Sequence, residues 1–275
     1  MHISTLEGNE LMNLNSYETL RFGNIDRVLT ITIDAPGPVN AVNEAMHREL
    51  ASVFLDAQDD PDSDLVVLTG AGKAFCAGGD MEWFRAMIAE PSTFRAIGPE
   101  AKRIVTSLLD LEKPIICKLN GAAAGLGATI ALLCDLIIAD DKAVIGDPHV
   151  KVGLVAGDGG AVIWPQLVGY AKAKELLMTG DMVPAAEAVN LGLINYAVPS
   201  DALDSKVDEL VSKILGNPKW AVRWTKTVTN LPLKELVVKL MDASIAYETL
   251  ANMTQDRAEA VTAFVEKRPP EYSGE

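Results

Sequence analysis

The sequence contains few cysteines and no long apolar run. Its three cysteines, Cys76, Cys117 and Cys134, are odd in number, and no pair of them has C-x-x-C spacing. This pattern argues against a disulfide framework and against a zinc site, and it predicts reduced thiols in a cytoplasmic protein. Because no stretch reaches about 18 uninterrupted apolar residues, no transmembrane helix is predicted. Residues 1–16 lack a basic segment followed by an apolar one, so we predict a polar leader rather than a signal peptide.

Basic residues are scarce relative to acidic ones. The chain of 275 residues has 24 Lys and Arg against 38 Asp and Glu, which gives a formal net charge of -14. Nucleic acids and anionic membranes both need a cationic surface, so this balance argues against either as a partner, although it leaves room for one local basic site. Hydrophobic residues make up 49% and charged residues 23%, which is typical of a globular protein.

Strand and helix patterns alternate over the first 200 residues. Strands are predicted over residues 28–34, 65–70, 114–121 and 136–139, and helices over residues 43–58 and 122–133. From residue 201 onward only helical periodicity is found, with turn breaks at 216–218 and 231–232. We therefore predict an α/β fold in three parts, which are the polar leader 1–16, an α/β core 17–200 and a helical C-terminal module 201–275.

Two glycine-rich segments resemble phosphate-binding motifs but lack the full patterns. Residues 70–74 look like a P-loop, yet Val67 stands where the first glycine is required and Ala74 where Ser or Thr is required. In the segment that begins at residue 157, Val162 occupies the third glycine position of the dinucleotide fingerprint. The sequence therefore predicts neither a nucleoside triphosphatase nor an NAD site.

Two further glycine-rich turns, residues 73–81 and 120–128, each follow a strand pattern and precede a helix pattern. Small residues let a ligand approach the backbone, and helix N-termini offer unpaired N–H groups. If the turns lie side by side, they can aim two N–H donors at one oxygen, which is an oxyanion hole suited to a thioester enolate or a tetrahedral intermediate. The alternative, that the glycines serve only as tight connectors, stays open at this point.

Together with other stretches in the same order, these turns resemble the crotonase (enoyl-CoA hydratase/isomerase) superfamily. The resemblance extends over about 250 residues of the chain. The matching stretches are residues 38–43, 69–80, 113–121, 134–139, 153–160, 179–181, 188–193 and 264–268.

The resemblance implies a spiral of ββα units followed by a helical trimerisation module, in homotrimers or dimers of trimers. It implies that the backbone N–H groups of Gly79 and Leu126 form the oxyanion hole. It also implies an acyl-CoA substrate, in which coenzyme A is part of the thioester, and no permanently bound cofactor. The residues that match the coenzyme A site are Lys73, Ala74, Phe75, Ala77, Asp80 and Lys267, with Arg268 as a further basic candidate. The alternative for Lys73, Lys267 and Arg268 is that they are solvated surface charges without a role in binding coenzyme A.

The hydratases of this superfamily use two glutamates to position and activate water, and neither is present here. The first falls on Thr129 and the second on His149. A threonine cannot act as a carboxylate base, so hydration by the usual pair of glutamates is not predicted.

Histidine offers different chemistry at this position. The chain has three histidines, His2, His47 and His149, and His2 lies in the predicted leader. Asp158 follows His149 by nine residues, in a glycine-rich turn. An imidazole can act as a base near pH 7, and a carboxylate can orient it and stabilise its charged form. The alternative is a histidine that only hydrogen-bonds nearby backbone.

The stretch around His149, residues 146–165, resembles oxocamphor hydrolase, a crotonase relative that cleaves a carbon–carbon bond of a β-diketone. The match implies catalytic roles for His149 and Asp158 and, on shorter helical stretches, for His47 and Glu248. Residues 77–80 nevertheless form the loop of the members that use coenzyme A, which the diketone hydrolase lacks.

Three functions fit this combination of motifs. The leading hypothesis is an enzyme that stabilises an acyl-CoA enolate and moves water or a proton with His149 and Asp158. The second is hydrolysis of a β-diketone without coenzyme A, and the third is a non-catalytic scaffold. No metal site is predicted, because the histidines and carboxylates lack a ligand spacing such as H-E-x-x-H.

Overall fold

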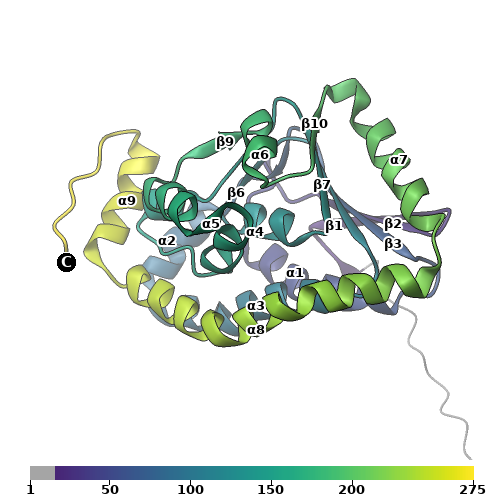
Figure 1. The fold of residues 1–275 in the computed structure, drawn as a ribbon. Coiled ribbons are helices and arrows are strands. Elements are labelled where there is room, and N and C mark those ends of the chain that lie inside the picture. The colour runs from purple at the N-terminus through teal and green to yellow at the C-terminus, as the bar shows by residue number, and fades with distance from the viewer. Residues whose placement is uncertain (1–15) are drawn as a thin grey trace, which may run out of the picture.

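The computed structural model describes residues 16–275, so the predicted leader lies almost entirely outside the described residues. Within this range the chain forms two sheets surrounded by helices (Figure 1). The strands are β1 Leu20–Ile25, β2 Val28–Ile33, β3 Leu65–Gly70, β4 Ala74–Cys76, β5 Ile115–Leu119, β6 Ala122–Ala124, β7 Leu136–Asp140, β8 Val144–Gly146, β9 Met182–Pro184 and β10 Tyr196–Val198. None of the helices in residues 16–275 combines the length and the apolarity needed to cross a membrane.

The larger sheet has six strands in the order β1-β2-β3-β5-β7-β10. The hairpin β1–β2 is antiparallel, and every other neighbouring pair is parallel. Strand β3 is buried on both faces, as its continuous apolar run predicts, because helices cover both sides of a parallel sheet. The four strands predicted from apolar patterns are all confirmed within one or two residues.

The smaller sheet has the order β4-β6-β8-β9 and explains the ββα repeat. Each of β4, β6 and β8 follows a strand of the larger sheet and precedes a helix, so the chain advances by one unit per turn of a spiral. The prediction of one helix over residues 122–133 was therefore wrong at its start. Ala122–Ala124 pairs with β4 and β8, which satisfies the backbone of this segment, and the helix starts only at Leu126, after Gly125 turns the chain with a φ of +54°.

The helices lie on both sides of the larger sheet (Figure 1). The main core packs between this sheet and the helices α1, α3, α4 and α5, and a second apolar cluster joins its other face to α7. The helices are α1 Glu44–Asp59, α2 Met81–Ala89, α3 Pro91–Asp110, α4 Leu126–Leu133, α5 Gly160–Thr179, α6 Ala185–Leu191, α7 Leu203–Leu215, α8 Lys219–Asn252 and α9 Gln255–Glu266, with short 3-10 turns η2 Pro148–Val152 and η3 Ser200–Ala202.

The long helix α8 runs beside α3 along one edge of the molecule (Figure 1). The break predicted at residues 231–232 is absent, because α8 continues through Pro232. A proline inside a helix removes one backbone hydrogen bond. Burial of Val237 and Met241 in the main core beside α3 offsets that loss. Exposed ion pairs between Lys102 and Asp242 (2.6 Å) and between Asp110 and Lys234 (2.7 Å) also join the two helices. The turn predicted at residues 216–218 separates α7 from α8.

Candidate active site

One pocket gathers the residues that the sequence singled out for catalysis. They come from α1, from the loop after β4, from the start of α4, from η2, from the loop before α5, and from α8. The predicted catalytic and oxyanion residues that line the pocket are His47, Gly79, Leu126, His149, Asp158 and Glu248. Most of the remaining wall is apolar, with Trp83, Phe84, Met87, Phe94, Ile97, Leu154 and Ile245 among its residues. The pocket therefore has one polar, ionisable end and a hydrophobic wall.

The two predicted oxyanion residues lie at the ends of paired strands. Strand β4 pairs in parallel with β6, so the turns that follow them, which carry Gly79 and Leu126, reach the same pocket. Leu126 is the first residue of α4, where backbone N–H groups have no acceptor within the helix. Gly79 leaves no room for a side chain, because a Cβ there would lie 2.1 Å from Cζ of Phe84.

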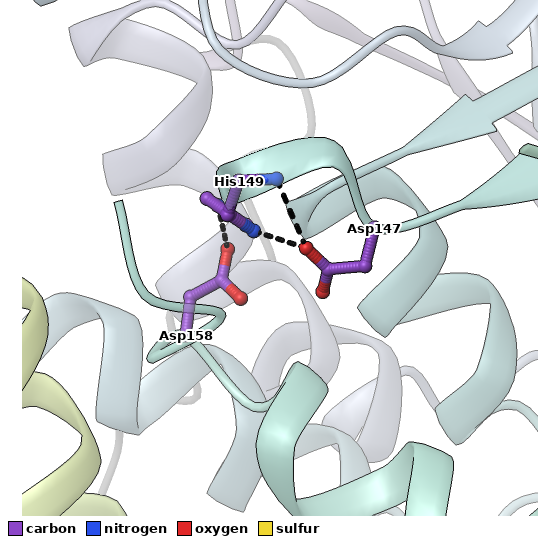
Figure 2. A group of neighbouring side chains, drawn as sticks. All are labelled: Asp147, His149 and Asp158. Atoms are coloured by element: carbon purple, nitrogen blue, oxygen red, sulfur yellow. Dashed lines mark hydrogen bonds and ion pairs between the residues drawn. The ribbon is translucent and has the colours of Figure 1, made fainter. Parts of the chain in front are cut away.

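His149 makes its shortest polar contact with a residue that the sequence analysis did not select. Asp147 is the N-cap of η2, and its Oδ1 lies 2.5 Å from Nδ1 of His149. Figure 2 draws this contact as a dashed line. The predicted partner, Asp158, forms an ion pair with the other ring nitrogen, with Oδ2 3.4 Å from Nε2. The imidazole therefore has a carboxylate near each nitrogen. The sequence did contain a signal for Asp147, because an acidic residue stands two positions before the histidine and directly before the proline that begins the turn.

Asp158 has polar neighbours besides His149. Oγ1 of Thr129 donates to its Oδ1 at 3.4 Å, and the backbone N–H of Gly160 also hydrogen-bonds to the carboxylate. Thr129 occupies the position of the first hydratase glutamate and is fully buried. It thus supports Asp158 where hydratases carry a carboxylate of their own.

The electrostatics of the cluster differ from the expectation of a histidine that titrates near pH 7. Burial by itself would lower the pKa of His149, but the charges of Asp147 and Asp158 outweigh it and raise the pKa to about 10. Burial raises the pKa of Asp158, and burial together with the charge of Asp158 raises the pKa of Glu248 to about 8. At neutral pH the imidazole is therefore cationic and Glu248 is protonated.

His47 and Glu248 approach the pocket from opposite ends of the sequence. His47 lies on α1, and its Nδ1 is 2.9 Å from Oε2 of Glu100 on α3. The centroid of the His47 ring lies 5.5 Å from the centroid of the Trp83 ring. Glu248, on α8, is 7% exposed and packs against Gly157, where a Cβ would lie 2.5 Å from its Oε2. Both residues therefore line the same pocket as His149.

The residues expected to bind coenzyme A lie outside this pocket. Ala74 and Phe75 are buried in β4, so any ligand would meet their backbone rather than their side chains. Asp80 is the N-cap of α2 and accepts the backbone N–H of Trp83 at 2.9 Å. Lys73 and Lys267 are exposed, and Ala77 is half-buried beside the turn. Their role stays a prediction.

The spacing of Asp147, His149 and Asp158 raises the question of a metal, because their potential ligand atoms lie within 4.8 Å of one another. Two ligands about 2.0–2.2 Å from one tetrahedral ion lie roughly 3.3 Å apart. The 2.5 Å contact between Asp147 and His149 is shorter than that and leaves no room for an ion between the two atoms, whereas charge-assisted N–H···O bonds are the short contacts of proteins, at about 2.7–2.9 Å. The cluster therefore favours proton chemistry.

Known proteins resemble this chain over nearly its whole length. The enoyl-CoA hydratase/isomerase family model matches residues 24–275. Crotonyl-CoA hydratase of Syntrophomonas wolfei is 33% identical over 259 residues, which cover 94% of this chain and 98% of that protein.

Solved structures have the same fold. An enoyl-CoA hydratase/isomerase from Mycobacterium paratuberculosis has a TM-score of 0.85 at 33% identity, over 89% of this chain and 97% of that one. A β-diketone hydrolase from the cyanobacterium Anabaena sp. PCC 7120, with (S)-3-oxocyclohexyl acetic acid bound, has a TM-score of 0.82 at 28% identity, over 90% of this chain and 98% of that one. The chain therefore belongs to the enoyl-CoA hydratase/isomerase family of enzymes, the crotonase superfamily.

Proposed function

We propose that the protein stabilises the enolate of an acyl-CoA thioester and that the His149–Asp158 pair moves the water or proton of the reaction. The observation that supports the proposal is that two functional groups line the same pocket. These are the turns of Gly79 and Leu126, and an imidazole with a carboxylate near each ring nitrogen. The first suits a thioester oxygen that gains negative charge, and the second suits proton transfer beside it.

In this proposal the thioester oxygen accepts hydrogen bonds from the backbone N–H groups of Gly79 and Leu126. Asp158, whose pKa burial raises, takes a proton from a water whose oxygen adds to the β-carbon of the enoyl thioester, and the electron pair of the double bond moves onto the thioester to give the enolate. His149 is charged at neutral pH and donates a proton from Nε2 to the α-carbon of the enolate. The pair thus supplies the one base and one acid that two glutamates supply in the hydratases. The same charges would serve attack of water on a β-keto carbon.

The coenzyme A portion would lie outside the pocket, over the turn that leads into β4. Backbone groups of Ala74, Phe75 and Ala77 would meet the adenine, with Asp80 at the end of the same turn. Lys73 is exposed at this turn and is available to a phosphate. Lys267 would come from a neighbouring subunit. Coenzyme A enters as part of the substrate, so no resident cofactor is needed.

Turnover of enoyl-CoA thioesters of different chain length tests the proposal. We expect hydration or isomerisation by the wild type, and we expect His149→Ala to lower kcat by about 10²-fold or more with little change in the affinity for coenzyme A. His2→Ala is the matched control, because the sequence predicts no role for it. Unchanged turnover in His149→Ala would refute the assigned proton donor.

A second candidate is hydrolysis of a β-diketone, which the resemblance to the Anabaena enzyme favours. Titration with coenzyme A and acetyl-CoA separates the two functions. Micromolar binding supports the acyl-CoA reaction, whereas cleavage of cyclic β-diketones without such binding supports the alternative. A protein that fails both assays would be the scaffold.

We also propose that α7, α8 and α9, the C-terminal module of residues 201–275, join copies of the chain into homotrimers or dimers of trimers. Large apolar side chains are exposed along α8 and α9. They are Trp220, Trp224, Val228, Leu231, Val238, Leu240, Tyr247, Leu250, Phe264 and Val265. Light scattering on a size-exclusion column measures the mass, and a monomer would refute this assembly.

A further inference from the structure

The carboxylate in shortest contact with His149 belongs to Asp147, which takes no part in the proton transfers proposed above. We propose that Asp147 is a positioning residue, which holds the imidazole of His149 through Nδ1 so that Nε2 is the nitrogen that exchanges a proton with the substrate. This assignment rests on the proposed function above, because it concerns the same proton transfer.

The contacts of Asp147 leave it one main partner. Its side chain is fully buried, and Oδ1 lies 2.5 Å from Nδ1 of His149 and accepts the backbone N–H of the same residue at 3.4 Å. Its Oδ2 has no hydrogen-bond partner among the described residues, and Gly160 packs against that oxygen so closely that a Cβ would lie 2.1 Å away. A buried carboxylate is unfavourable unless it is paired, so the carboxylate of Asp147 and the proton at Nδ1 of His149 stabilise each other.

A proton fixed at Nδ1 decides which nitrogen reacts. The ring of His149 turns its Cε1 atom toward Gly125, where a Cβ would lie 3.2 Å from Cε1, 3.5 Å from Nε2 and 3.7 Å from Nδ1, and Gly125 immediately precedes Leu126. The ring therefore lies beside the turn that supplies one of the two proposed oxyanion donors, and because Asp147 holds Nδ1, Nε2 is the nitrogen that can exchange a proton there. An imidazole that rotated away from Asp147 would lose both the contact and this alignment.

The charged groups around His149 come from several elements. Asp147 and Asp158 flank the ring, Glu248 faces it from α8, and His47 on α1 and Arg257 on α9 act on Asp158 and Glu248. Among the groups that act on His149, Asp147 contributes both the largest charge interaction and a hydrogen bond. Its removal should therefore lower the pKa of His149 from about 10 toward the ordinary value of about 6.5.

This effect predicts a loss of activity that depends on pH. In Asp147→Asn, the fraction of charged His149 would fall about tenfold for each pH unit above its new pKa. We expect kcat close to that of the wild type at pH 6 and about 10–30-fold lower at pH 8, with little change in KM. Asp147→Ser keeps an N-cap oxygen but is too short to reach Nδ1, so nothing would hold the ring, and we expect this variant to lose kcat at both pH values.

A matched control separates positioning from loss of structure. Asp135→Asn also removes a carboxylate that is paired with a buried cation, here Lys226, but Asp135 does not line the pocket. We expect this variant to lose stability without a change in its pH–rate profile. Wild-type kcat at both pH values in Asp147→Ser, or equal loss at pH 6 and pH 8 in Asp147→Asn, would overturn the assignment.

Nitrogen-15 NMR of the histidine rings tests the same inference without substrate. In the wild type we expect a proton at Nδ1 of His149 throughout pH 5–9, and in Asp147→Asn we expect titration within this range. A wild-type ring whose proton lies only on Nε2 would overturn the assignment even if the variants fail to fold. If the NMR result holds and no thioester is turned over, the proposed function fails and the positioning of the ring stands.

Discussion

Replacement of Gly79 by alanine would place a methyl group against the ring of Phe84. The new Cβ would lie 2.1 Å from Cζ and 2.4 Å from Cε1, whereas carbon atoms in contact are about 3.5–4.0 Å apart. The ring cannot move freely, because Phe84 is 8% exposed, packs with Met87 and Phe94, and has the guanidinium of Arg257 4.3 Å from its centroid. The loop that carries the Gly79 N–H must therefore shift by about 1 Å or more.

A shift of this size exceeds the tolerance of a hydrogen bond, so the variant should lose one oxyanion donor. Loss of a single donor typically lowers kcat by about 10²–10³-fold. Overpacking of this kind also costs about 1–3 kcal/mol of stability. Both effects have the same origin, and we expect them to appear together in Gly79→Ala.

Turnover of crotonyl-CoA and urea-induced unfolding measure the two effects separately. Gly23→Ala is the matched control, because a Cβ at Gly23 has no atom within 4 Å, so its activity and stability should stay close to those of the wild type. The double variant Gly79→Ala/Phe84→Leu makes room for the methyl group and should recover part of the lost turnover. Wild-type turnover in Gly79→Ala would refute the role of its N–H.

Two further predictions concern stability. The pKa of Glu248, about 8, lies above its value of about 4.3 in an unfolded chain, so folding keeps a proton that unfolding releases, and the stability due to this group falls as pH rises through that window. The glutamine in Glu248→Gln cannot ionise, so the melting temperature of this variant, relative to that of the wild type, should be higher at pH 9 than at pH 4. The same difference in melting temperature at both pH values would contradict the raised pKa of Glu248. Asn40 has a φ of +52° and donates from Nδ2 to the carbonyls of Ala71 (3.0 Å) and Ala74 (2.9 Å), so Asn40→Ala should lose about 2–3 kcal/mol in urea unfolding. Asn40→Asp, which keeps the shape but not the donors, should lose at least as much, and near-native stability in both variants would remove the role of these bonds.

Local patterns in the sequence predicted much of the fold. The runs that became β3 and β7 each begin with four apolar residues, and the helical spacing over residues 43–58 became α1 with Asn43 as its N-cap. The errors occurred where tertiary contacts override local preference. Three alanines joined the smaller sheet as β6, and Pro232 remained inside α8, which packs along α3.

The catalytic cluster shows the same division. Residue type and motif singled out His149 and Asp158, but not Asp147, because a carboxylate two residues before a histidine has no fixed geometry until η2 forms and the turn is buried. Glu248 and His47 were selected from short helical matches, and only the packing of α8 and α1 against the pocket brings them to His149.

The sequence by itself determined the α/β alternation, the glycine turns and the absence of the two hydratase glutamates, because these depend on residue type and on spacing along the chain. The tertiary structure decided which carboxylate holds His149, and it decided that the imidazole is charged and Glu248 neutral at neutral pH. Burial and the distances between charges determine protonation, and both arise only when segments distant in the chain enclose one pocket.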